Sequence, residues 1–130
     1  MNAKYLFELL FPLLEDDCIE KFKVGITNDI DTREKQYQAN GYTVLIHIAS
    51  GDNTTVKALE SELINLLKNK FPQKCENLQI ENEGNAKKCN KVYIAIKIIN
   101  PIDITTLQII RLLRTLPLNI DYDKADENID

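Results

Sequence analysis

Four side chains suited to phosphate chemistry occur at spacings that could bring them to one place. Lys23 stands two residues before Gly25 on one side of an alternating stretch. Arg33 and Tyr37 are four residues apart and share a face of the helix expected there. Glu60 lies at the edge of an apolar helical stripe, where a carboxylate needs a partner or a metal ion. A carboxylate for Mg²⁺, an arginine for transition-state charge, and a phenol or amine for a water's proton suit phosphodiester hydrolysis.

Each of these side chains also has a purely structural interpretation. Arg33 taken alone is a surface helix residue, Tyr37 could pack against a sheet, and Lys23 could face solvent from its strand. Glu60 could form an ion pair with a lysine of its own helix. His47, the single histidine, has no acid nearby in the sequence, which favours a place at the edge of the core. The combined spacing of the set is what favours a site.

Hydrophobic periodicity predicts the elements that would hold these residues. Alternation predicts strands, and leucines at helical spacing predict the long helix that Pro72 ends. From Lys21 onward we expect a strand, a short polar helix, a strand, a long helix and a strand, over Lys21–Thr27, Asn28–Gln38, Tyr42–Ser50, Thr54–Phe71 and Lys91–Ile99.

The two ends of the chain are less regular. Tyr5–Phe11 fits a strand or a short helix, and Pro12 limits any helix, so we count it as a strand. Apolar spacing predicts an added helix over about 102–116, followed by a disordered acidic tail over 119–130. The expected order is β, β, α, β, α, β, α. This predicts one α/β domain of the α+β type over 1–118, with a small mixed or antiparallel sheet flanked by helices.

Composition narrows the class of protein. A chain of 130 residues with 44% hydrophobic residues predicts one folded domain. No apolar run is long enough to span a bilayer, and the first residues lack the features of a secretory signal, so an intracellular protein is expected. The spacing of Cys18, Cys75 and Cys89 gives no structural zinc site. Reduced thiols are expected, with a Cys75–Cys89 disulfide as the alternative.

The net charge of −4 is unevenly distributed along the chain. Residues 1–20 carry −4 and residues 121–130 carry −4, so the residues between them carry +4. A weakly basic body between acidic ends is compatible with contact to a phosphate backbone. Scattered lysines that form only a solvated surface are the alternative.

The segment of residues 22–37, FKVGITNDIDTREKQY, resembles the second half of the GIY-YIG nuclease motif. In one branch of that family the motif reads Lys-Ile-Gly followed by Thr or Ser, and a helix with an arginine comes next. Lys23-Val24-Gly25 and Arg33 match this pattern. The helix VKALESELINLL resembles the family's helix with the metal-binding glutamate. The resemblance extends over about residues 3–98 and leaves out the added C-terminal helix.

The resemblance implies an endonuclease that hydrolyses DNA phosphodiester bonds with a single Mg²⁺ or Mn²⁺ ion held by Glu60. Arg33 would stabilise the pentavalent phosphate, and both Lys23 and Arg33 would contact nucleic acid. Lys23 and Tyr37 would stand where other members have tyrosine and histidine. The first half of the motif should lie on a preceding strand and end in a tyrosine, for which Tyr5 is the upstream candidate. Tyr5 would then be the general base or part of its hydrogen-bond network.

Several alternatives stay open at this point. An asparagine that completes some sites of the family could be Asn77 or Asn90. The substrate could be RNA in place of DNA. The chain could also be an inactive nuclease-fold module that binds nucleic acid or a nucleotide through Lys23 and Arg33. The chain could instead be a protein-interaction module or a homo-oligomer that uses the C-terminal helix or the acidic ends.

Overall fold

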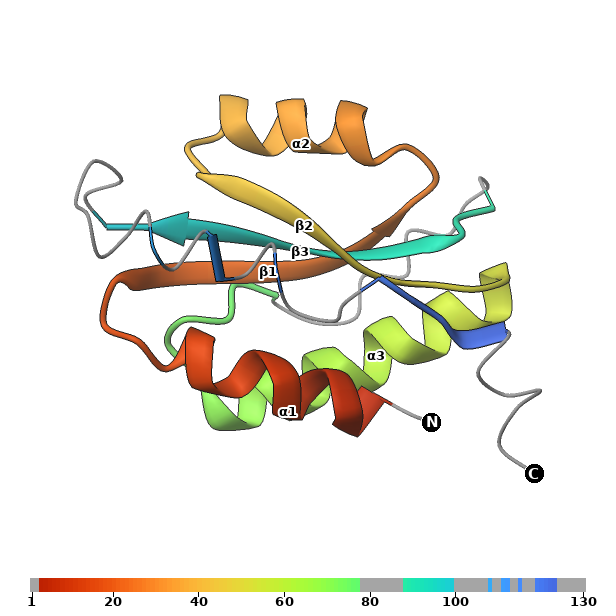
Figure 1. Ribbon diagram of the computed structural model, residues 1–130, viewed down its shortest axis with the longest axis horizontal. Helices are drawn as coiled ribbons and strands as arrows, with labels where there is room; N and C mark the ends of the chain where they lie inside the picture. Colours follow the sequence, from red (N-terminus) through yellow and green to blue (C-terminus); the bar gives the residue numbers. More distant parts are fainter. Residues whose placement is uncertain are drawn as a thin grey trace.

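A mixed sheet with helices on both of its faces organises this protein (Figure 1). The computed structural model describes residues 3–77, 88–99, 108, 111–112, 115 and 119–123. The elements within these ranges are α1 (Ala3–Leu14), β1 (Ile19–Thr27), α2 (Ile30–Ala39), β2 (Val44–Ser50), α3 (Asn53–Lys70), β3 (Lys91–Ile98) and β4 (Ile120–Asp121). The expected α+β fold class is confirmed.

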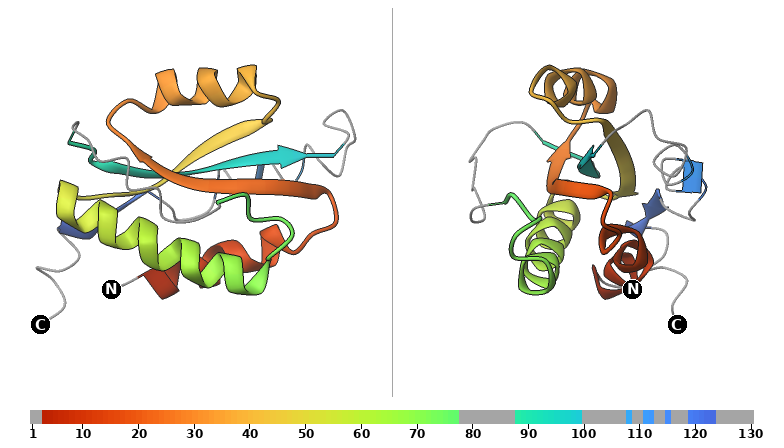
Figure 2. Two further views of the ribbon diagram at one scale, coloured as in Figure 1. Left: turned by 180° about the vertical axis from the view of Figure 1, so that it is seen from behind. Right: turned by 90° about the vertical axis from the view of Figure 1, so that its left-hand side faces the viewer.

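The last long strand in sequence, β3, lies in the interior of the sheet. The strand order is β1-β3-β2-β4, with β1 and β2 antiparallel to β3 and β4 parallel to β2. Helix α2 covers one face, and α1 and α3 cover the other (Figures 1 and 2). Because side chains alternate along each strand, the β1–β3–β2 register decides which residues meet beneath α2.

The two faces of the sheet bury two separate apolar clusters. The larger cluster lies between the sheet and the pair α1 and α3, and it includes Phe22 and Val24 of β1. The smaller cluster lies on the α2 side, where Ile30 and Tyr37 of α2 pack against it. Its buried members are Tyr42, Leu45, Tyr93 and Ala95. Few apolar residues of α2 face the sheet, so polar side chains share this surface.

The first segment of the chain is a helix, and the prediction of a strand there is wrong. Ala3, Leu6, Leu10 and Leu14 recur at helical spacing and are fully buried. This one-sided burial stabilises α1 against α3. Pro12 lies inside the helix on an exposed position, near enough to its end that little of the helix follows the missing N–H.

The C-terminal part of the chain also differs from expectation. The predicted disorder from residue 119 is wrong for Asn119–Asp123, because Ile120–Asp121 pairs with β2 and Tyr122 is 1% exposed. The expected helix over about 102–116 falls mostly outside the described residues. Four of its residues are described, and all are helical and exposed: Gln108, Arg111, Leu112 and Thr115. No helix in the described ranges has the length and apolar composition needed to cross a membrane.

Aspartate side chains cap α2 and α3. Asp29 accepts a hydrogen bond from Thr32 N at the start of α2. Asp52 accepts a hydrogen bond from Thr55 N at the start of α3. These caps fix where each helix leaves the sheet.

The loop after α3 closes the outer edge of β1. The Phe22 N–H donates to Lys74 O at 2.9 Å, and the Glu76 N–H donates to Phe22 O at 2.8 Å. The Asn77 side chain bonds Val24 on both sides, accepting from its N–H and donating to its carbonyl, each at 2.9 Å. Asn77 is 5% exposed. At the centre of β1, the Asn77 side chain therefore makes the two backbone hydrogen bonds that a neighbouring strand would otherwise make.

We predict that Asn77→Ala lowers the free energy of unfolding by about 2–3 kcal/mol, because both buried backbone groups of Val24 lose their partners. Urea denaturation followed by circular dichroism measures this loss. The matched control is Asn40→Ala, which removes an exposed amide bond to Gln36 O and should change stability by about 0.5 kcal/mol or less. Equal losses in the two variants would contradict the role given to Asn77.

Candidate functional site

The site begins where Tyr93 of β3 lies across Gly25 of β1. The two residues are partners in the antiparallel register, and the Tyr93 side chain is on the α2 side of the sheet. A Cβ atom on residue 25 would overlap the hydroxyl oxygen and Cζ of Tyr93. Only glycine leaves room for the ring, so Gly25 fixes where the Tyr93 hydroxyl lies.

Helix α2 adds a second phenol to the first. Tyr93 Oη donates a hydrogen bond to Tyr37 Oη at 3.0 Å, and the two rings meet at 68° with centroids 5.5 Å apart. Tyr37 also meets Tyr42 edge-on, with centroids 5.0 Å apart. Tyr37 therefore packs against the sheet, and its hydroxyl group accepts the hydrogen bond from Tyr93. Tyr37, Tyr42 and Tyr93 thus form one aromatic cluster.

The charges of Arg33 and Glu60 both act on the Tyr93 phenol. Burial, and then the neighbouring Tyr37, raise the pKa of Tyr93 well above its usual value. The Arg33 guanidinium opposes this rise in pKa, and the Glu60 carboxylate adds to it. Arg33 and Glu60 are both partly buried, and they come from helices on opposite faces of the sheet. A cation and an anion thus lie within electrostatic range of one protonated phenol.

Lys23 lies on the same side of β1 as Gly25 and is partly buried. It pairs with Ala95 of β3, one step along the sheet from the pair formed by Gly25 and Tyr93. Its ammonium group is among the charges that lower the pKa of Glu76. Lys23 therefore lies between the Tyr93 site and the carboxylate of Glu76.

Tyr5 is not brought to this site. It lies on α1, which covers the opposite face of the sheet, and it is 39% exposed. Tyr93 was not among the residues predicted for the site. Its only distinguishing feature in the sequence is that it is a polar aromatic residue within the apolar segment VYIAIK. A tyrosine was expected on a strand that precedes Gly25, whereas the strand that pairs with β1 follows it in the sequence.

His47 of β2 lies on the other side of Tyr93 in the same row of the sheet. Its Nε2 atom is 3.0 Å from Ala49 O, and burial lowers its pKa, so the ring is neutral at pH 7. A structural role at the edge of the core was predicted for His47. The register adds that it is a direct neighbour of the Tyr93 site.

The two asparagines considered from the sequence have different surroundings. Asn77 supports Val24, as described above, and Asn90 Oδ1 accepts from Lys91 Nζ at 3.0 Å. None of the three cysteines forms a disulfide, in agreement with the expected reduced thiols. Burial raises the pKa of the Cys75 thiol, which keeps it protonated.

A metal ion at this site would have one protein carboxylate. Within the described ranges, no three His, Cys, Asp or Glu side chains gather as a ligand set. Mg²⁺ commonly binds through one or two carboxylates and completes its coordination with water and substrate phosphate. Glu60, partly buried and within range of Tyr93, fits that donor set.

Comparison with family models, with curated proteins and with solved structures gave no match to this chain.

We predict that Gly25→Ala lowers the free energy of unfolding by about 1–3 kcal/mol, because the new methyl group forces the Tyr93 ring to move. The cost should fall to under about 1 kcal/mol when Tyr93→Leu is already present, since the overlapping atoms are then gone. Urea denaturation of the four proteins in this double-mutant cycle measures the coupling. An equal cost of Gly25→Ala in both backgrounds would contradict the proposed overlap.

Proposed function

We propose that this domain hydrolyses phosphodiester bonds of nucleic acid, DNA in the first instance, at a GIY-YIG-type site in which Tyr93 supplies the phenol. The position of the Tyr93 hydroxyl carries the proposal. It lies over Gly25 and donates a hydrogen bond to Tyr37, and the charges of Arg33 and Glu60 act on its pKa. The strand with the tyrosine is β3, which pairs with β1 but follows it in the sequence. The chain would then carry the two halves of the motif in reversed order.

The residues suit distinct roles in hydrolysis. The Arg33 guanidinium offers several N–H donors to the phosphate, where charge increases in the transition state. Lys23 adds a second cation beside the same phosphate. Glu60 would hold a Mg²⁺ or Mn²⁺ ion, which supplies positive charge and acidifies a bound water. The water oxygen forms a bond to phosphorus as the bond to the leaving oxygen breaks. Solvent accepts the proton of the attacking water and supplies the proton that the leaving oxygen takes up.

The raised pKa of Tyr93 limits what its hydroxyl can do. A phenol held protonated by burial is a poor acceptor of a proton from water. It is a good hydrogen-bond donor, and its bond to Tyr37 fixes the direction of both hydroxyl groups. We therefore assign the pair Tyr37 and Tyr93 to orienting the attacking water.

A second function has its own support. Tyr93 is 3% exposed, and no set of three or more ligating side chains surrounds Glu60 among the described residues. A buried phenol and a single carboxylate also suit a module that binds nucleic acid through Lys23 and Arg33 without cleaving it. The two functions differ in turnover, and both need Arg33.

We predict metal-dependent cleavage of plasmid, single-stranded DNA or RNA by the full chain in Mg²⁺ or Mn²⁺, and loss of cleavage in a chelator. Arg33→Ala and Glu60→Gln should each lower the cleavage rate by about 100-fold or more, because each removes charge that stabilises the transition state. The matched controls are Lys35→Ala on α2 and Glu62→Gln on α3, both exposed, which should keep the wild-type rate.

Absence of cleavage on every substrate and metal would contradict the nuclease function. If the wild-type protein then binds the same nucleic acids, and Arg33→Ala weakens this binding, the binding module is the supported function. If Arg33→Ala and Glu60→Gln both cleave at the wild-type rate, the roles assigned to these two residues are contradicted.

A further inference from the structure

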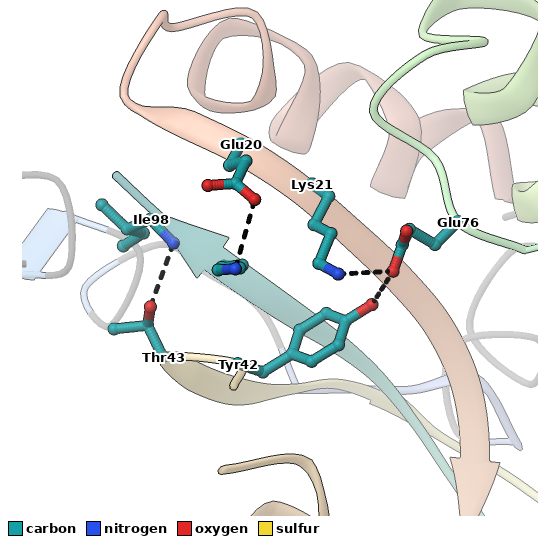
Figure 3. Close-up of polar contacts among 7 residues, drawn as sticks. Glu20, Lys21, Tyr42, Thr43, Glu76 and Ile98 are labelled. Carbon is teal, nitrogen blue, oxygen red and sulfur yellow. Dashed lines mark hydrogen bonds and ion pairs between the residues drawn. The ribbon is translucent and has the colours of Figure 1, made fainter. Parts of the chain in front are cut away.

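On the α2 side of the sheet, a tyrosine and a lysine hold the carboxylate of Glu76 (Figure 3). Tyr42 Oη donates to Glu76 Oε1 at 2.6 Å, and Lys21 Nζ lies 3.1 Å from the same oxygen. The Lys21 ammonium group is also 5.2 Å from the centroid of the Tyr42 ring. The Tyr42 hydroxyl, then Lys21 and Lys23, lower the pKa of Glu76, so its carboxylate stays charged. This oxygen thus accepts from a hydroxyl group and pairs with the Lys21 ammonium group, while the Lys23 charge acts on the same carboxylate from farther away.

The backbone fixes the position of Glu76. Its N–H donates to Phe22 O, and the adjacent Asn77 is bonded to Val24 by its whole amide group. The side chain itself is 41% exposed. The carboxylate is therefore presented to Tyr42 from a rigid base, yet it is open to exchange with solvent and with other anions.

This group continues the surface of the Tyr93 site. The Tyr42 ring contacts Tyr37, which is bonded to Tyr93. Lys21, Lys23 and Gly25 alternate along one side of β1, so each step between them is about 6.6 Å. That step is comparable to the separation of neighbouring phosphates along an extended nucleic-acid strand. A strand with one phosphate at the Tyr93 site could place the next ones over Lys23 and Lys21.

We propose that Tyr42, Lys21 and Lys23 form a phosphate subsite for a nucleic-acid strand, and that Glu76 occupies this subsite in the unbound protein. The proposal deepens the proposed function and rests on it for the identity of the ligand. Carboxylate and phosphate oxygens accept hydrogen bonds from the same hydroxyl and ammonium donors. A backbone phosphate would take the donors that Glu76 now holds, and the exposed carboxylate would turn to solvent.

The ion pair of Lys97 and Glu20 on the same sheet provides a comparison for the contact of Lys21 with Glu76. Lys97 Nζ lies 3.3 Å from Glu20 Oε2, with both side chains partly exposed (Figure 3). No phenol donates to Glu20 in the contacts of Figure 3, whereas Glu76 accepts from Tyr42 as well as from a lysine. Glu20→Gln and Glu76→Gln change the net charge equally, so they form a matched pair of variants.

We test the proposal with the full chain in a chelator, by fluorescence anisotropy of a labelled short oligodeoxythymidylate. Glu76→Gln should tighten binding by about three-fold to ten-fold, because Lys21 and Lys23 are released from a competing charge. Glu20→Gln should change it by less than about two-fold. Adding Tyr42→Phe to Glu76→Gln should remove most of the gain. The dependence of the binding constant on salt should steepen by about one unit in Glu76→Gln.

Equal effects of Glu76→Gln and Glu20→Gln, or weaker binding in Glu76→Gln, would overturn the subsite. Thermal unfolding of each variant identifies any loss of binding that comes from loss of fold. Thymidine monophosphate that competes as well as the oligonucleotide, at equal phosphate, would overturn the assignment to a strand. Because cleavage plays no part in this assay, a tighter Glu76→Gln variant would support the subsite even where the nuclease function fails.

Discussion

The contact of the Tyr93 ring with Gly25 is the constraint on which the candidate site depends. The ring fills the space that any larger residue at position 25 would occupy, and this puts its hydroxyl above β1. The antiparallel register of β1 and β3 fixes which residues meet there. Lys23 and Gly25 fall on the α2 side because residues on one face of a strand alternate. A shift of that register by one residue would send every one of these side chains to the other core.

The rest of the fold supports this contact from three sides. Helix α2, capped by Asp29, places Tyr37 on the Tyr93 hydroxyl and brings Arg33 within range. Helix α3 brings Glu60 from the opposite face. The loop after α3 pairs with the outer edge of β1 through Asn77, and it carries Glu76 to the far end of the same surface. The candidate site and the proposed phosphate subsite beside it therefore share one strand, β1.

Local patterns predicted the elements well, and they placed part of the site. Alternation over Lys21–Thr27 and helical spacing over Thr54–Phe71 reflect burial on one side, which neighbouring residues largely determine. Arg33 and Tyr37 share a helix face for the same reason. The same kind of reasoning failed for Tyr5, because four small or apolar residues at helical spacing make its segment a helix on the other face.

Tyr93 and Glu76 could not be placed from sequence, because their partners are set by strand order. The sheet order β1-β3-β2 puts the strand from residue 91 beside the strand from residue 19, and no local pattern encodes that pairing. Tyr42 and Glu76 meet across 34 residues for the same reason. The strand Ile120–Asp121 is also defined only by its parallel pairing with β2. Long-range pairing thus decides the chemistry that short-range patterns only suggest.

The central claim is that the phenol of the site comes from β3, and the most direct measurement compares Tyr93→Phe with Tyr5→Phe in single-turnover cleavage. The account predicts that Tyr93→Phe lowers the rate of the chemical step by about 100-fold while Tyr5→Phe keeps the wild-type rate. Each variant removes one hydroxyl group and leaves its ring in place. Wild-type cleavage by Tyr93→Phe, with loss of cleavage in Tyr5→Phe, would contradict it.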